Sequence, residues 1–124
     1  MDLIVSANDA KLVRTAGVDA FPEDAGPDTL SVIDAGRSPP AVVATLAVST
    51  SIAGPPQAVA ISPGGRIAVV GAPTRYDREQ QRLVFDTCLQ MVDLAADPPA
   101  LVQRIDIGHH PQGLAINRIG TLLL

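Results

Sequence analysis

The hydrophobic residues of this chain are gathered in short runs of four to eight residues, and each run ends at Gly, Pro, Asp or Asn. Runs of this length, rich in Val, Ile, Leu and Ala, are typical of β-strands, and none has the spacing of an amphipathic helix. The segment Arg104–Ile107 alternates polar and apolar residues, as on a strand with one solvated face. Val59–Ile61 and Ile67–Val70 are almost wholly apolar, which indicates strands covered on both faces.

Three of these segments occur twice in the same order. The spacing between copies is 59 residues for the first two blocks and 55 for the third, so four residues within Ser49–Ala53 are extra in the first copy. Self-similarity at such a period is the signature of a repeat architecture. The paired blocks are Leu30–Asp34 with Leu89–Asp93, Pro39–Val48 with Pro98–Ile107, and Pro56–Ser62 with Pro111–Asn117.

The repeated unit is predicted to be a four-stranded antiparallel meander. Its strands are expected at 57–62, 67–71, 88–93 and 101–107, and the tight turn Ser62–Gly65 joins the first two. Residues 1–54 then supply the last three strands of one unit, with a long insertion, and 55–107 form a complete unit. Residues 108–124 begin the next, with its first strand and part of its second. Repeated four-stranded units build β-propellers, so the sequence predicts an all-β fold of about two blades, one complete and two partial.

The same segments resemble the YVTN-type β-propeller repeat proteins, a superfamily that includes lactonase-like and surface-type propellers. The matching residues are Pro56–Gly65, Ile67–Ala72, Thr29–Asp34, Val42–Val48 and Ile105–Pro111. Val69 and Val70 depart from the family pattern, which has a Tyr-Val pair there. The resemblance implies a propeller fold and favours a periplasmic or secreted protein.

A closed propeller needs about four to eight blades, which is several times more than this chain provides. We therefore expect the chain to be a fragment whose other blades lie in the same longer protein. The alternative is that several copies assemble one ring by self-association. Two blades alone would leave strand edges and apolar faces bare, so the isolated chain is expected to be aggregated or only partly ordered.

Charge and composition narrow the classes of partner. The formal net charge is −4, and Lys11 is the single lysine, which argues against nucleic acid or an anionic membrane surface. The chain has three aromatic residues, Phe21, Tyr76 and Phe85, too few for a platform that stacks bases or sugars. No apolar run approaches the roughly 18 residues of a membrane span, so no such span is expected.

The connections predict where a binding site would lie. In an antiparallel meander alternate connections emerge at the same end, and every long or polar connection here falls at one end. Long loops on a rigid scaffold are where binding usually occurs. We therefore expect a non-catalytic propeller that offers one loop-rich face to a protein or small-molecule ligand. These connections are the insertions Asn8–Asp28 and Pro73–Thr87 and the links Ser49–Pro55 and Gly108–Pro111.

Five residues on that face are candidates for ligand binding. Arg75, Tyr76 and Arg78 could lean over the central channel and meet an anionic or polar ligand; the alternative for this insertion is a solvated hairpin extension or a short helical turn. His109 and His110 form an exposed pair. A metal site needs three or four convergent ligands, and no other His is present, so neither a metal nor a cofactor is predicted unless a missing blade supplies partners.

The other residues with reactive or charged side chains are interpreted as structural rather than catalytic. Asp34 and Asp93 end equivalent strands and are expected to accept backbone N–H bonds in the following turns. Asp9, Lys11 and Arg14 occupy, in the first unit, the position that Arg75–Arg82 occupies in the second. Cys88 is expected to be buried and inert. Two alternative functions stay open by resemblance: part of a lactonase-like hydrolase, or part of a redox-enzyme propeller subunit. No catalytic residue is predicted in this chain.

Overall fold

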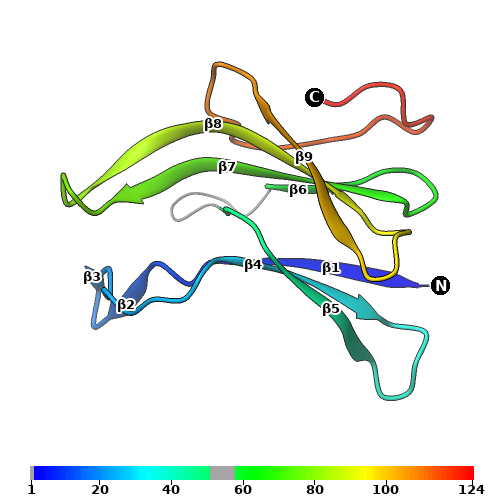
Figure 1. Cartoon of the computed structure of the whole chain (residues 1–124), viewed down its shortest axis with the longest axis horizontal. Helices are drawn as coiled ribbons and strands as arrows, with labels where there is room; N and C mark the ends of the chain where they lie inside the picture. Colours follow the sequence, from blue (N-terminus) through cyan, green and yellow to red (C-terminus); the bar gives the residue numbers. More distant parts are fainter. Residues whose placement is uncertain (1, 51–57) are drawn as a thin grey trace.

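A computed structural model describes residues 2–50 and 58–124 of the chain. Within these ranges the fold is all-β, with nine strands and no helix (Figure 1). No helix in the described ranges is therefore long and apolar enough to cross a membrane. The strands are β1 (Leu3–Asn8), β2 (Val13–Thr15), β3 (Val18–Ala20), β4 (Thr29–Asp34), β5 (Ala41–Ala47), β6 (Val59–Ile61), β7 (Ile67–Asp77), β8 (Arg82–Asp93) and β9 (Ala100–Asp106).

The strands form three antiparallel sheets. The order β6-β7-β8-β9 is a four-stranded meander, and β1-β4-β5 is a three-stranded one. The short hairpin β2-β3 stands apart, within the first insertion. The all-β class and the antiparallel meander predicted from the sequence are confirmed. The expected unit boundary between residues 54 and 55 lies outside the described residues.

Two strands are longer than the sequence predicts. The strand expected at 67–71 continues to Asp77, and the strand expected at 88–93 begins at Arg82. The insertion Pro73–Thr87 therefore prolongs the β7-β8 hairpin, with the register running to the pair Asp77 and Arg82 after an irregularity between Ala72 and Thr74. Of the two alternatives for this insertion, the hairpin extension is the one observed.

The two larger sheets pack face to face around one core (Figure 1). The three-stranded sheet contributes Leu30 and Val32, which lie two residues apart on β4 and so point to the same face. Val70 and Val92 meet them from the four-stranded sheet, and all four side chains are almost completely buried. Val48, Ala68 and Leu94 complete the buried cluster.

The two copies of the sequence repeat adopt matching local geometry. Each copy has one register irregularity at the equivalent position, after Val32 in β4 and after Met91 in β8, which are 59 residues apart. Asp34 accepts the backbone N–H of Gly36 at 3.0 Å, and Asp93 accepts that of Ala95 at 2.9 Å. The predicted role of both aspartates in the following turns is thus confirmed.

Residues 115–124 form a shorter version of the β6-β7 hairpin. Ile116 forms an isolated antiparallel bridge with Leu123, at the positions that correspond to the pair Ile61 and Ala68 in β6 and β7. Asn117 donates its backbone N–H to Leu122 at 3.0 Å, as Ser62 donates to Ile67 at 2.8 Å. The first strand expected within residues 108–124 is reduced to this isolated bridge in the described structure.

Candidate functional site

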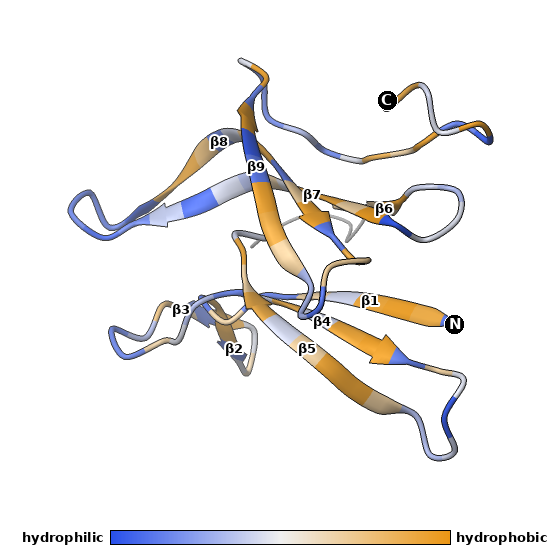
Figure 2. Ribbon diagram, turned by 45° about the vertical axis from the view of Figure 1, so that its right-hand side comes forward, coloured by the Kyte–Doolittle hydropathy of each residue, from blue (hydrophilic) through white to orange (hydrophobic). Residues whose placement is uncertain are grey.

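The two insertions lie at one end of the molecule, as the sequence predicts, whereas most of the link Ser49–Pro55 lies outside the described residues. Figure 1 shows the β2-β3 hairpin and the tip of the β7-β8 hairpin on its left side, with the β6-β7 turn and the β4-β5 and β8-β9 links on its right. Figure 2 shows that the turn between β7 and β8 and the adjoining end of β7 are hydrophilic, whereas the adjoining end of β8 is hydrophobic. We call the left end the long-connection face.

The two insertions, distant in sequence, contact each other on this face. The ring of Tyr76, on β7, stacks on Phe21 of the first insertion, with centroids 3.9 Å apart and planes at 4°. Arg78 donates to the carbonyl oxygen of Pro22 at 2.8 Å, and its guanidinium carbon lies 6.0 Å from the Tyr76 ring centroid. Aromatic stacking of this kind adds about 0.5–1.5 kcal/mol beyond the burial of surface. The hairpin extension is therefore anchored to the other sheet's insertion.

The tip of this hairpin is closed by local hydrogen bonds. The Asp77 carboxylate accepts the backbone N–H groups of Glu79 and Gln80, at 3.1 and 3.0 Å, and Gln81 takes a positive φ of 49°. An aspartate that accepts backbone donors two and three residues ahead is a usual way to form a tight turn. Arg75 lies 3.9 Å from Asp77 with its side chain 55% exposed, so its guanidinium is accessible to solvent.

One of the two predicted histidines, His110, lies against the same hairpin. The His110 ring stacks on Phe85 of β8, with centroids 4.4 Å apart and planes at 18°. Phe85 itself is 69% exposed, and His109 is exposed. Of the five predicted site residues, Arg75, Tyr76, Arg78 and His110 thus lie on or against the β7-β8 extension. His109 has no such contact in the described structure.

The start of the Gly108–Pro111 link, which contains both histidines, is held by hydrogen bonds to Asp106. The Asp106 carboxylate accepts the Thr87 hydroxyl at 2.7 Å and the Gly108 backbone N–H at 2.9 Å. These hydrogen bonds, from Thr87 first and then from Gly108, lower the pKa of the Asp106 carboxyl below its ordinary value. Gly108 has a positive φ of 72°, a conformation that glycine adopts without steric cost. The chain is thereby turned from β9 toward Phe85.

A buried polar cluster supports the base of the first insertion. Asp28, which is 6% exposed, accepts the backbone N–H groups of Ala10 at 3.1 Å and Thr50 at 2.9 Å. It also pairs with the Lys11 ammonium, which lies 3.1 Å from Asp9. Burial lowers the pKa of Lys11, and Asp9 partly offsets that effect.

The polar residues of the first insertion do not extend the candidate site. Asp9 and Lys11 belong to the buried cluster around Asp28. Arg14 pairs with Asp19, its opposite residue across the β2-β3 hairpin. All three residues correspond in position to Arg75–Arg82. They form their ion pairs within the first insertion.

One buried amide joins the two sheets below the face. Gln90, on β8, has no exposed surface. Its side chain accepts the Ser49 N–H at 2.9 Å and donates to the Ser49 carbonyl at 2.7 Å. This paired hydrogen bond fixes the start of the link that leaves the three-stranded sheet. We call it the Gln90 clamp.

Sequence reasoning missed four residues that position the face: Phe21, Phe85, Asp28 and Gln90. Phe21 and Phe85 carried a signal, because all three aromatic residues of the chain lie in the two insertions. Gln90 also carried a signal, because it is a polar residue within the apolar run Leu89–Val92. The partner of each residue lies in another segment, and the sequence pattern does not identify it.

Among the described residues, no group of three or more His, Cys, Asp or Glu side chains is arranged to hold a metal ion. Cys88, expected to be buried, is only partly so. Its sulfur lies 3.4 Å from the carbonyl oxygen of Leu89.

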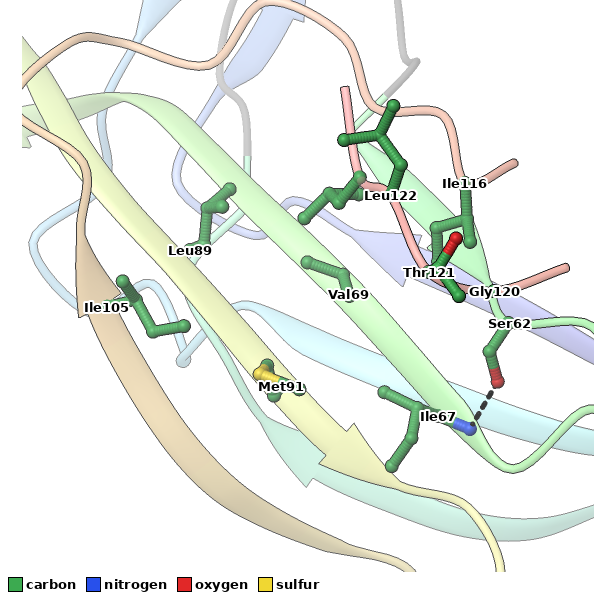
Figure 3. Close-up of a pocket in the computed structure, with 11 residues that line it drawn as sticks. Ser62, Ile67, Val69, Leu89, Met91, Ile105, Ile116, Gly120, Thr121 and Leu122 are labelled. Carbon is green, nitrogen blue, oxygen red and sulfur yellow. Dashed lines mark hydrogen bonds between the residues drawn. The ribbon is translucent and has the colours of Figure 1, made fainter.

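The described residues also line several hollows. One, of about 260 Å³, separates the four-stranded sheet from the last residues of the chain, and Figure 3 shows its mostly apolar lining, including Val69, Leu89 and Met91. Another, of about 420 Å³, lies between β1 and β6 and reaches Asp9 and Thr50.

Comparison with known proteins gives no match. No family model matches the sequence, and no curated protein and no solved structure is significantly similar to the chain.

Proposed function

We propose that this chain is part of a non-catalytic β-propeller repeat protein whose long-connection face binds a protein or small-molecule ligand. The single observation that carries the proposal is the anchoring of the β7-β8 extension by Tyr76 on Phe21 and by Arg78 on Pro22. A solvated hairpin without a function has no need of such an anchor, whereas a binding loop gains affinity from being ordered in advance.

The accessible groups suggest the chemistry of the ligand. Arg75 presents a half-exposed guanidinium, His109 an exposed imidazole, and Phe85 an exposed ring. Arginine and aromatic residues are the types most enriched at protein interfaces. Arginine also binds carboxylates with two parallel hydrogen bonds. The proposed ligand is therefore a segment of a protein, or a small molecule, that carries a carboxylate beside an apolar group.

The repeat supports the scaffold part of this proposal. A four-stranded meander packs on a three-stranded one, and the pairing of Ile116 with Leu123 begins the same pattern again. Meanders that stack face to face in series are the building plan of a propeller. Under this proposal the Gln90 clamp lies at a joint between blades.

A random peptide library selected on the chain tests the binding face. We expect enriched peptides to contain Asp or Glu near an apolar residue, and to bind the double variant Arg75→Ala/His109→Ala at least tenfold more weakly. Arg118→Ala is the matched control, because Arg118 is exposed in the turn of the last residues. Enriched peptides that bind the double variant as well as the wild type, or a library with no enrichment, would overturn the proposal.

A further inference from the structure

The first insertion contains a hairpin whose two strands pair only with each other in the described structure. β2 and β3 form a sheet of their own, and all six of their residues are exposed. A two-stranded hairpin alone is at best marginally stable in water, and a third strand along one edge stabilises it. The insertion of the second copy prolongs β7 and β8 instead, so the repeat itself provides no strand for this hairpin.

One face of the hairpin is charged and the other is apolar. On the charged face Arg14 donates to both carboxylate oxygens of Asp19, at 2.5 and 2.9 Å. On the opposite face Val13 is 48% exposed and Val18 is 69% exposed, so covering this face would remove apolar surface from water. Because successive residues of a strand alternate between faces, the apolar face consists of Val13, Thr15, Val18 and Ala20.

The turn of the hairpin determines which backbone groups face outward. Ala16 and Gly17 have positive φ values of 50° and 80°, as in the type I′ turn of a two-residue hairpin. The two residues that flank such a turn bond to each other. In the next pair, Arg14 with Asp19, the backbone N–H and C=O groups therefore point away from the partner strand. Asp19 thus offers one backbone donor and one acceptor at the outer edge of β3.

The charges around β3 indicate what kind of strand fits this edge. Hydrogen bonds from Arg14 lower the pKa of the Asp19 carboxyl, so Asp19 is ionised at neutral pH. Glu23 and Asp24, both exposed, follow within five residues. Opposite charges placed directly across two strands attract, and like charges repel. Pairing of β3 with β3 of a second copy, centred on Asp19, would set two carboxylates opposite each other and is therefore disfavoured.

We propose that the outer edge of β3 binds an extended segment of another protein, in which a lysine or arginine stands between two aliphatic residues. In an antiparallel arrangement the basic residue lies opposite Asp19 and exchanges two backbone hydrogen bonds with it. Its side chain then lies on the charged face, and its aliphatic neighbours extend the apolar face beside Val18 and Ala20. In strand addition the backbone supplies affinity and the alternate side chains supply specificity.

Peptide binding to the whole wild-type chain tests this proposal by fluorescence anisotropy. The probe is the labelled, end-capped peptide Ser-Thr-Val-Lys-Val-Thr-Ser, which we expect to bind. The same peptide with glutamate in place of lysine is expected to bind about fivefold more weakly, because it sets two carboxylates opposite each other. A third peptide, N-methylated at the lysine nitrogen, cannot donate to the Asp19 carbonyl and is expected to lose binding. A lysine peptide that does not bind, or that binds no better than either of the others, would overturn the proposal.

Amide hydrogen exchange, measured by NMR, locates the bound peptide. We expect the lysine peptide to slow exchange at the Asp19 amide, and to change less the amides of Val18 and Ala20, which face β2. Slower exchange at Arg14 instead would place the peptide on the other edge and contradict the proposal. Slow exchange at Asp19 in a concentrated sample without peptide would show that a second copy occupies this edge, and would also contradict it.

A charge-removing variant tests the role of the carboxylate. Asp19→Asn is expected to weaken binding of the lysine peptide and to leave that of the glutamate peptide less impaired. Asp97→Asn is the matched control, since Asp97 is exposed in the link between β8 and β9. Equal weakening by the two substitutions would mean that Asp19 does not select the basic residue.

This inference does not rest on the proposed function, because the two sites use different residues and ligands of opposite charge. Arg75→Ala/His109→Ala is expected to bind the lysine peptide like the wild type. Asp19→Asn is expected to bind the acidic peptides of the library like the wild type. Either proposal can therefore fail without the other.

Discussion

At the scale of single residues, a few buried polar side chains hydrogen-bond to the backbone of segments distant in sequence. Asp28 accepts backbone and ammonium donors together. Gln90 bonds both the backbone N–H and the backbone carbonyl of Ser49 with its side-chain amide. A buried polar group is costly only when its partners are missing, so these two residues specify which segments meet.

We predict that Gln90→Leu lowers the free energy of unfolding by about 1–3 kcal/mol, because it leaves the Ser49 N–H and C=O without their partner. Urea denaturation measures the change. Gln103→Leu is the matched control, since Gln103 is exposed on β9, and surface changes of this kind stay within about 0.5 kcal/mol. An equal effect of the two substitutions would show that the clamp does not contribute.

At the scale of elements, the strands follow from short apolar runs and turn residues, while their ends depend on tertiary contacts. The run Ile67–Val70 identifies β7 from sequence alone. Its continuation through Arg75 and Tyr76 is polar and offers no hydrophobic pattern. It becomes strand because β8 pairs with it and because Phe21, 55 residues away, covers the ring of Tyr76. A contact between two insertions is not visible in either insertion's sequence.

We predict that Tyr76→Ala loosens the tip of β7-β8 and the Phe21–Pro22 segment together. Loss of a stacked aromatic pair, about 0.5–1.5 kcal/mol, corresponds to roughly 2- to 13-fold faster amide hydrogen exchange if exchange follows local opening. Tyr76→Phe keeps the ring and is expected to exchange like the wild type. Faster exchange at the tip alone, with Phe21 unchanged, would contradict the anchoring.

At the scale of the whole molecule, the repeat is what sequence reasoning captures best. The spacing predicts two meanders in series, and the matched turns at Asp34 and Asp93 show the same geometry in each copy. The sequence predicts the positions of the candidate site residues better than it predicts the side chains they pack against. Four of the five meet the β7-β8 extension, but their packing partners, Phe21 and Phe85, are recognised only once the two sheets are placed together.

We predict that the two sheets unfold as one unit, because the side chains of Leu30, Val32, Val70 and Val92 share one core. Leu30→Ala is expected to cost about 2–5 kcal/mol, and to reduce hydrogen-exchange protection in β4 and β7 alike. Leu124→Ala, at a side chain that is 74% exposed, is the matched control and is expected to leave protection unchanged. Lost protection in β4 alone would mean that the sheets are independent.

The Gln90 clamp has a consequence for engineering. At the position that corresponds to Gln90, the first copy has Ser31, whose hydroxyl accepts Asn8 within its own sheet at 3.1 Å. The copies have therefore diverged at the residue that joins neighbours, and they are not interchangeable modules. A synthetic array that multiplies residues 55–107 would bring a glutamine to every joint, whereas one that multiplies the first copy would bring none. Shuffling the order of units would then disrupt assembly even where every strand is kept.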